Sequence, residues 1–359
     1  MTPNTIDLRH QLHQHPGISG NECFAHDTIV SFLSSLHPDA LHTHVGGYGV
    51  IASWGSPSLP AIAFRADTDA LPYGHCCGHD GHTAILLHLA ALVDAHRPAQ
   101  RCIVLCFQSE EETGAGSQKL IDSGLLQQYD IRAFFGLHNL PGFPLGRLVF
   151  NSNTFAAAST GICLHLQGRQ THASTPEKGI NPGLAAAAFM QCMASLNTSP
   201  DNYADFMQTT LVGLSLGGND YGISAGSADI HYTLRAFTNN AMQRLLDATL
   251  STAQALADSN GLTLSHTLHD TFRATENSAS LVDILGRIAR QQGFDHQLIQ
   301  QPFRWSEDFA NYLTLWPGAF FGIGAGEDHL ELHHPDYDFP DAVIDTAAHF
   351  FFAIANHNN

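Results

Sequence analysis

The stretch from Gly74 to His82 constrains this chain most, because it holds two cysteines, three histidines and an aspartate within nine residues. It lies between a strand-like apolar run, Ala61–Ala66, and an apolar helix expected over Thr83–Ala95. Cys77 and His79 stand two residues apart, so both side chains can point to one side of an extended or tightly turned backbone, as two ligands of one ion must. A structural zinc site would need a second Cys/His pair at similar spacing, which the other cysteines do not supply. Metal chemistry is therefore the first hypothesis.

Strand-like and helix-like segments alternate around this stretch. Short apolar runs bounded by Gly, Ser and Pro, as buried strands are, occur at Gly49–Trp54, Ala61–Ala66 and Arg101–Phe107. A strand, the helix Thr83–Ala95 and a further strand indicate a parallel unit. The closing segment returns to a helix, a strand and a terminal helix, expected at Ser278–Gly293, Gly318–Ile323 and Asp341–Asn356. These elements predict an α/β catalytic domain formed by residues 1–157 and 271–359.

The pattern between these two segments differs, and its elements follow the order β-α-β-β-α-β. This order is typical of a ferredoxin-like α+β domain. The expected elements are Gly161–Gln167, Pro182–Ser195, Phe206–Ser215, Ala228–Phe237, Asn240–Asn260 and Leu262–His269. We therefore expect an inserted lid or dimerisation domain at residues 158–270.

Composition narrows the class of protein. A chain of 359 residues with 44% hydrophobic content can bury a large core in two domains. The net charge of −18 argues against a nucleic-acid partner, which requires clustered Lys and Arg. No basic segment followed by an apolar run begins the chain, and no run of eighteen apolar residues occurs, so we expect a cytoplasmic protein without membrane contact. Seven cysteines fit reduced thiols better than a disulfide framework.

Polar side chains also follow two of the expected strands. Glu110, Glu111 and Glu112 come after Arg101–Phe107, at the end of a sheet strand where open α/β sheets place their sites. An acidic first turn of the following helix would explain part of this cluster, but three consecutive glutamates exceed that need. His138 ends another apolar strand, Ala133–Asn139, and taken singly it fits a core histidine with satisfied hydrogen bonds better than a ligand.

An ordered set of motifs runs nearly from end to end of the chain. Its members are Leu8-Arg9-His10-Gln11-Leu12-His13-Gln14-His15-Pro16, Phe64-Arg65-Ala66-Asp67-Thr68-Asp69-Ala70-Leu71-Pro72, Cys77-Gly78-His79-Asp80-Gly81-His82, Glu111-Glu112, Gly136-Leu137-His138, Thr171-His172-Ala173, Ser306-Glu307-Asp308-Phe309 and His333-His334-Pro335. In this set the chain resembles the binuclear-metal aminoacylase and carboxypeptidase family. The similarity is to the amidohydrolase branch with hippurate hydrolase, N-acyl-amino-acid deacetylases and indoleacetyl-amino-acid hydrolases. It implies a zinc-peptidase-like catalytic domain with a mixed sheet.

The resemblance also implies a site and a reaction. The metal ligands would be Cys77, His79, Glu112, His138 and His333. They would hold two divalent ions, zinc or manganese with cobalt and nickel as alternatives, about 3.5–4 Å apart around a water. Glu111 takes the family's general acid/base place. Of the three consecutive glutamates, Glu111 and Glu112 are assigned these roles because they follow Phe107-Gln108 at the spacing found in the family. The expected substrate is an N-acyl amino acid or a similar small amide, and the expected assembly is a homodimer or higher homo-oligomer.

Further residues take supporting places by the same resemblance. Groups that orient the ligands or cover the site would be Asp67, Asp69, Asp80 and His82, although helix capping and strand-end turns account for them nearly as well. His172 resembles a family histidine that polarises the scissile carbonyl, often across a dimer contact. Arg235 resembles a family arginine that pairs with the carboxylate of the substrate. Each of these two could also be a plain surface residue. Glu307 and Asp308 lie either near the metals or at a helix N-terminus.

The chain departs from the family pattern in three places. Only four residues, Tyr73–Cys76, separate Pro72 from Cys77, where the family loop is longer. Gly222 falls where the family has a lid asparagine, and Asn219 in a shifted loop is its expected substitute. Glu177 stands where the family has a second lid histidine. Two alternatives therefore stay open, namely a dipeptidase or exopeptidase of the same family and a catalytically silent metal-binding protein.

Overall fold

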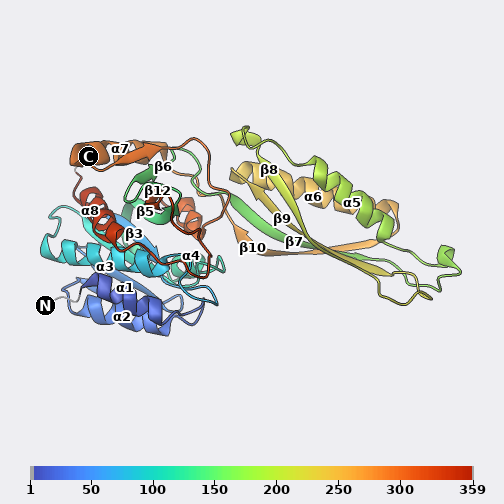
Figure 1. The fold of residues 1–359 in the computed structure, drawn as a ribbon, viewed down its shortest axis with the longest axis horizontal. Coiled ribbons are helices and arrows are strands. Elements are labelled where there is room, and N and C mark those ends of the chain that lie inside the picture. Colours follow the sequence, from blue (N-terminus) through green and yellow to red (C-terminus); the bar gives the residue numbers. More distant parts are fainter. Residues whose placement is uncertain (1–3, 358–359) are drawn as a thin grey trace. The chain divides into compact units, whose positions relative to one another are not determined.

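The apolar runs of the sequence form the centre of an eight-stranded mixed sheet in the computed structural model, which describes residues 4–357 (Figure 1). The strand order is β1-β2-β4-β3-β5-β12-β6-β11. The four central strands β4, β3, β5 and β12 are parallel, whereas β2 pairs antiparallel with β4 and β6 antiparallel with β12. The strands are Ala40–Val45 (β1), Gly49–Trp54 (β2), Pro60–Asp67 (β3), Cys102–Gln108 (β4), Asp130–Pro141 (β5), Leu148–Phe150 (β6), His296–Leu298 (β11) and Gly318–Gly326 (β12).

Helices pack on both faces of this sheet. They are Thr5–Gln14 (α1), Cys23–Ser34 (α2), His79–Ala95 (α3), Gly116–Asp122 (α4), Ala279–Gln292 (α7) and Ala342–Asn356 (α8), with 3-10 helices at Leu126–Gln128 (η1) and Asp308–Thr314 (η4). Successive side chains of a strand point to opposite faces. Phe64 of β3 accordingly packs in the core with α3 and α8, whereas its neighbour Arg65 meets Asp308 of η4 on the other side.

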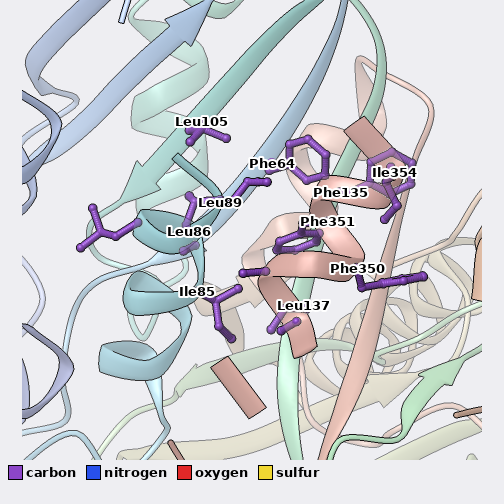
Figure 2. Close-up of a cluster of buried hydrophobic side chains, with 14 of the residues drawn as sticks. Phe64, Ile85, Leu86, Leu89, Leu105, Phe135, Leu137, Phe350, Phe351 and Ile354 are labelled. Atoms are coloured by element: carbon purple, nitrogen blue, oxygen red, sulfur yellow. The ribbon is translucent and has the colours of Figure 1, made fainter. Parts of the chain in front are cut away.

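The main core lies between the sheet and the helices α3 and α8. Figure 2 shows Phe64, Leu105 and Phe135 of the strands in one cluster with Leu86 of α3 and Phe351 of α8. These side chains are at most 2% exposed, so each removes nearly its whole apolar surface from water. Burial of one such side chain stabilises the fold by roughly 1.5–3 kcal/mol. The cluster therefore fixes α3 and α8 firmly against the strands that carry the site.

The chain divides into two compact units. Unit 1, described above, comprises the residues up to 155, 275–300 and those from 307 onward, and unit 2 comprises Ala156–Ala274 with Gln301–Ser306. Unit 2 contains a separate antiparallel sheet in the order β10-β7-β9-β8. Its elements are Ala158–Gln167 (β7), Pro176–Lys178 (η2), Gly183–Ser195 (α5), Tyr203–Asp205 (η3), Met207–Leu216 (β8), Ser227–Ala236 (β9), Asn239–Ser259 (α6) and Thr263–Phe272 (β10). The mixed α/β sheet and this second sheet confirm the expected fold class.

Helix α3 begins at His79, four residues before the expected start at Thr83. Gly78, which precedes it, has a φ of 94°, and a Cβ there would lie 2.7 Å from the side-chain amide of Asn139. Only glycine combines this left-handed backbone with such a close approach. The turn places His79, Asp80 and His82 in the first turn of the helix, next to the carboxyl ends of the parallel strands. Among residues 4–357, no helix has the length and apolar character needed to span a membrane.

Candidate metal centre

Five side chains with metal-binding atoms converge in unit 1. Cys77 Sγ lies 3.4 Å from His333 Nε2 and 3.8 Å from His138 Nε2. His79 Nε2 lies 3.9 Å from Glu112 Oε1. One donor atom each of Cys77, His79 and His138 lie within 4.8 Å of one another, and the same holds for Cys77, Glu112 and His333. Cys77 belongs to both groups, so the structure brings all five residues expected as ligands into one cluster.

Four separate segments of the sequence supply these residues. Cys77 and His79 flank the start of α3, and Glu112 follows β4. His138 lies within β5, and His333 lies between β12 and α8. The adjacent parallel strands β3, β4 and β5 end at the same edge of the sheet, which is why these segments meet there.

His333 reaches the cluster in an uncommon backbone conformation. Its φ is 68°, and its backbone N–H donates to the carbonyl of Cys76 at 2.8 Å. A histidine in the left-handed region costs about 1–3 kcal/mol and persists only where the surroundings hold it. Tyr73 adds a second contact, because its hydroxyl donates to the His333 carbonyl at 3.3 Å. The short segment Tyr73–Cys76 thus fixes the position of His333.

The unpaired atoms of the cluster fit a cation. His79 Nδ1 lies 3.0 Å from the Asp69 carbonyl and His138 Nδ1 lies 2.9 Å from the Asn139 carbonyl. A carbonyl only accepts, so each Nδ1 carries the proton and each Nε2 a lone pair, the arrangement found in metal-bound histidines. His79 Nε2 and Glu112 Oε1 are buried without a hydrogen-bond partner. Two orphaned acceptors beside a thiol are the donors that a borderline divalent ion takes.

Electrostatics also favour positive charge here. Burial, together with Glu112 and Glu111, raises the pKa of the Cys77 thiol well above its usual range, so the thiolate needs a nearby cation. Burial opposes a charge on His79, yet Asp67 and Cys77 beside it raise the pKa of that imidazole well above its usual range. Burial and the neighbouring His82 hold the pKa of His138 well below its usual range, so His138 is neutral, as a ligand must be.

Glu111 and Glu110 point to different surroundings. Glu111 is 6% exposed, and one of its carboxylate oxygens lies within 4.8 Å of donor atoms of His79 and Glu112. Burial and the carboxylates of Glu307, Asp308 and Glu112 raise its pKa well above the usual range. Glu110, in contrast, binds Lys119 Nζ at 2.6 Å. This places Glu111 and Glu112 at the cluster, and Glu110 in an ion pair beside it.

The residues expected to support the ligands occupy different positions. Asp67 Oδ1 bonds His82 Nδ1 at 2.5 Å, and His82 Nε2 bonds the Asn139 side chain at 2.6 Å. Asp69 accepts from the backbone N–H of Glu112 at 3.0 Å, in addition to its carbonyl contact with His79. Asp67 and Asp69 therefore contact the segments that carry the ligands.

Asp80 points to another part of unit 1. It lies 3.3 Å from Arg9 Nη1 and 2.9 Å from His13 Nδ1, and both of these residues belong to α1. Its second oxygen accepts from the backbone N–H of Gly81 at 3.0 Å. Asp80 thus ties the N-terminal helix to the start of α3.

Arg65 is a residue of the site for which sequence reasoning gave no role. Its side chain has no exposed surface and lies 2.6 Å from Asp67, 2.7 Å from Asp308 and 3.0 Å from Glu307. Its Nε donates to the Gln108 side chain at 2.9 Å. A lone arginine inside the apolar run Ala61–Ala66 was the available signal, because a charge in a buried strand requires partners.

Glu307 and Asp308 combine the two roles left open for them. Glu307 caps the 3-10 helix η4 by accepting from the Phe309 N–H at 3.3 Å, and it also pairs with Arg65. Burial outweighs the effect of Arg65 and raises the pKa of Glu307 to about 7. Both residues therefore lie at a helix N-terminus and in the charge network behind Glu111.

The residues expected to bind substrate in the lid lie in unit 2. His172 Nδ1 lies 2.7 Å from Ser174 Oγ, and the next residue, Ala173, donates its N–H to the Gly222 carbonyl at 2.9 Å. Asn219 is exposed in the loop after β8, three residues before Gly222. The loops that carry His172 and Gly222 are therefore paired.

Arg235 lies on β9 of the same unit. It donates to the Arg304 carbonyl at 2.6 Å and to Ser306 Oγ at 3.2 Å. These two contacts hold the guanidinium group in place within unit 2.

Comparison with known proteins agrees with this geometry. Residues 63–357 match the family model described as Peptidase family M20/M25/M40. The chain is 29% identical to the N-acetyl-L-cysteine deacetylase of Bacillus subtilis (strain 168), over 98% of this chain and 87% of that protein. It is 26% identical to the hippurate hydrolase of Campylobacter jejuni, over 99% of this chain and 98% of that protein.

A solved structure shows the same fold. It is a dinuclear metal-binding peptidase of the M20 family from Bacillus subtilis, with a TM-score of 0.84 and 24% identity. The alignment covers 98% of this chain and 96% of that one. The family match spans well over half of the chain, and the relatives above are named as hydrolases. This chain belongs to peptidase family M20/M25/M40 and is a hydrolase, as its motifs predict.

Proposed function

We propose that this protein is a metal-dependent amidohydrolase that cleaves the amide bond of N-acyl amino acids or similar small amides. The observation that carries the proposal is the cluster of Cys77, His79, Glu112, His138 and His333, with the buried carboxylate of Glu111 beside it. The substrate class is supported by the relatives, which are named as a deacetylase of N-acetyl-L-cysteine and as a hydrolase of hippurate.

The cofactor in this proposal is a pair of divalent ions held by those five residues. Zinc or manganese fit the mixed sulfur, nitrogen and oxygen donors, and cobalt and nickel are alternatives. When bound, such ions polarise a carbonyl and lower the pKa of water toward neutrality. The Nε2 of His79 and the Oε1 of Glu112 support this assignment, because both atoms are buried without a hydrogen-bond partner.

Glu111 acts as the general acid and base. Its carboxylate accepts a proton from the attacking water and donates it to the leaving amine nitrogen. The raised pKa of Glu111 suits this shuttle, because efficient proton transfer requires a pKa near the working pH. The backbone carbonyl of Asp69 orients the His79 ring. The hydrogen bonds of His82 with Asp67 and with Asn139 fix the position of the segment next to His138.

Unit 2 supplies the groups that bind substrate. His172 polarises the scissile carbonyl, and Arg235 pairs with the substrate carboxylate, with Asn219 as a further polar contact. The two contacts of Arg235 with Arg304 and Ser306 support this role, because they orient the guanidinium before substrate arrives.

The active form is a homodimer or higher homo-oligomer assembled through unit 2. Strand β8 is at the edge of its sheet and exposes Leu211, Val212, Leu214 and Leu216. An exposed apolar edge strand is a site of association. Light scattering coupled to size-exclusion chromatography tests this, and a monomer at micromolar concentration would contradict it.

The cytoplasm is the compartment that fits the cysteines. All seven are free, and Cys102 and Cys106 are buried in β4 as reduced thiols. Reduced cysteines persist in the cytosol, where thiol reductants keep disulfides from forming. Localisation of a tagged chain tests this assignment.

The decisive experiment is a hydrolysis panel with metal-loaded protein. N-acetyl and N-benzoyl amino acids should be cleaved faster than dipeptides, and Glu111→Gln should abolish turnover while retaining metal. Preference for dipeptides would favour a peptidase of the same family. Absence of turnover with any amide would favour a silent metal-binding protein, for which Gly222 and Glu177 are the motivation.

A further inference from the structure

A second group of potential metal ligands lies on the outer side of unit 1, on helices α3 and α8. It consists of His88 of α3 and of Asp345 and His349 of α8. One donor atom of each lies within 4.8 Å of the other two. His88 Nε2 is 3.9 Å and His349 Nδ1 is 3.3 Å from Asp345 Oδ1. The two rings lie with their centroids 5.8 Å apart.

The core fixes the relative position of these three residues. Leu86 and Leu89 of α3 and Phe351 of α8 belong to the same buried cluster (Figure 2). Asp345 and His349 are four residues apart and therefore lie on one face of α8. Their proximity to His88 follows from helix packing and needs no interaction among the three side chains themselves.

The imidazoles are oriented as ligands. His349 Nδ1 lies 2.9 Å from the Asp345 carbonyl, which only accepts, so Nδ1 carries the proton and Nε2 a lone pair. His88 Nδ1 lies 3.4 Å from Thr5 Oγ1 of α1, and its Nε2 faces Asp345. Metal-bound histidines use the same pattern, with the second ring nitrogen held by a carbonyl or another oxygen.

The donor atoms, which lie within 4.8 Å of one another, stand farther apart than those around a coordinated ion. With ligand distances of about 2.1 Å, the donors of a tetrahedral zinc site stand about 3.4 Å apart. Asp345 and His349 are 73% and 46% exposed, so their side chains can rotate to close the remaining distance.

We propose that His88, Asp345 and His349 bind one divalent transition-metal ion of the zinc class, separate from the cluster around Cys77. Two imidazoles and one carboxylate suit zinc, cobalt or nickel, whereas calcium and magnesium require mainly oxygen donors. The ion crosslinks α3 and α8, two helices that are far apart in the sequence. The site does not depend on the proposed hydrolase function.

The test is zinc binding by the full-length chain, purified without a histidine tag and measured by equilibrium dialysis at fixed free zinc. His349→Gln and His88→Gln should each bind one zinc ion fewer per chain than the unmodified protein. His96→Gln is the matched control, because His96 is an exposed histidine that ends the same helix α3. It should bind as many ions as the unmodified protein. The difference in zinc content does not depend on how many ions the Cys77 cluster holds.

Equal zinc content in the unmodified protein and in both variants would overturn the proposal. Asp345→Asn, at a position 73% exposed, provides the same comparison if His88→Gln does not fold. Added zinc should also raise the melting temperature of a Cys77→Ser chain, and His349→Gln in that background should remove the rise. Failure of the hydrolase proposal would appear as absent turnover with the zinc difference intact.

Discussion

Arg65 and Asp67 are two residues apart on β3, and their side chains meet at 2.6 Å with no exposed surface on either. The other oxygen of Asp67 bonds His82 in the first turn of α3. The guanidinium therefore fixes, through Asp67, the helix turn that carries His79. Arg65 also pairs with the buried carboxylates of Glu307 and Asp308, which lie behind Glu111.

Replacement of this arginine should destabilise unit 1 strongly. In Arg65→Met, three buried carboxylates lose their partner, and removal of one member of a buried pair costs about 3–5 kcal/mol. The free energy of unfolding from urea titration measures the loss. The control is Arg132→Met, because Arg132 forms an ion pair with Asp130 at 69% and 45% exposure. That exposed pair should contribute about 1 kcal/mol or less. Equal losses in both variants would contradict the role given to Arg65.

Removal of the proton shuttle should separate catalysis from metal binding. Glu111→Gln should keep its metal content and lose turnover by about 10²–10⁴-fold or more, because an amide cannot accept the proton of the attacking water. Steady-state kinetics and elemental analysis measure the two quantities. Glu110→Gln is the adjacent control and should keep its turnover, since Glu110 pairs with Lys119. Retained activity in Glu111→Gln with metal bound would show that the base lies elsewhere.

Peroxide should inactivate the protein through Cys77. A cation that exchanges at the site holds Cys77 as the thiolate, the form that peroxide oxidises to sulfinic acid, and thiols do not reverse that oxidation. Readdition of metal should then fail to restore activity, and peptide mass spectrometry should find the oxidised sulfur at Cys77. Cys192 is the control, because it is exposed and belongs to unit 2. Full recovery of activity with Cys77 oxidised would contradict the ligand assignment.

The Asp94 carboxylate should make the free energy of unfolding decrease at acidic pH. Burial opposes its charge, but hydrogen bonds from Trp54 Nε1, the His37 N–H and Arg97 lower its pKa below the usual value. A carboxyl with a depressed folded pKa stabilises the fold above its unfolded pKa, about 3.9, and loses that contribution as pH falls through the folded pKa.

The matching variant is Asp94→Asn. It should lower the free energy of unfolding by about 1–3 kcal/mol at pH 7, and the difference from the unmodified protein should shrink below about pH 4. Urea titrations at several pH values measure both effects. Asp122→Asn, at an exposed residue bonded to Gln118, should show little change at either pH. A loss that stays constant down to pH 2 would contradict the charge-based explanation.

The long helices and the central strands of the sheet could be predicted from the sequence. β3, β4 and β5 are apolar throughout most of their length, and such a continuous apolar run is typical of a strand that is buried on both faces. The short strands β6 and β11 at one end of the sheet were not expected, because three residues are too few to show a periodic pattern. The start of α3 at His79 was missed because it depends on the left-handed Gly78 and on the proximity of Asn139.

The candidate ligands were named from motifs, whereas their environment required coordinates. The network around Arg65 joins β3 to residues more than two hundred positions later, and no local pattern reports such a contact. Asp80 likewise binds Arg9 and His13 of α1, a pairing that adjacency to His79 does not predict. The left-handed backbone of His333 is set by its contact with Cys76, which is also remote in sequence.

The interruption of unit 1 by unit 2 has a consequence for how the protein matures. Cys77, His79, Glu112 and His138 all precede residue 156, whereas His333 follows the whole of unit 2. Because synthesis proceeds from the N-terminus, a nascent chain carries four of the five donors while the intervening unit is still emerging. Completion of the donor set is therefore a late event in biogenesis. A cell short of transition metal would accumulate full-length chains in which the five donors have met but no cation lies beside the Cys77 thiol.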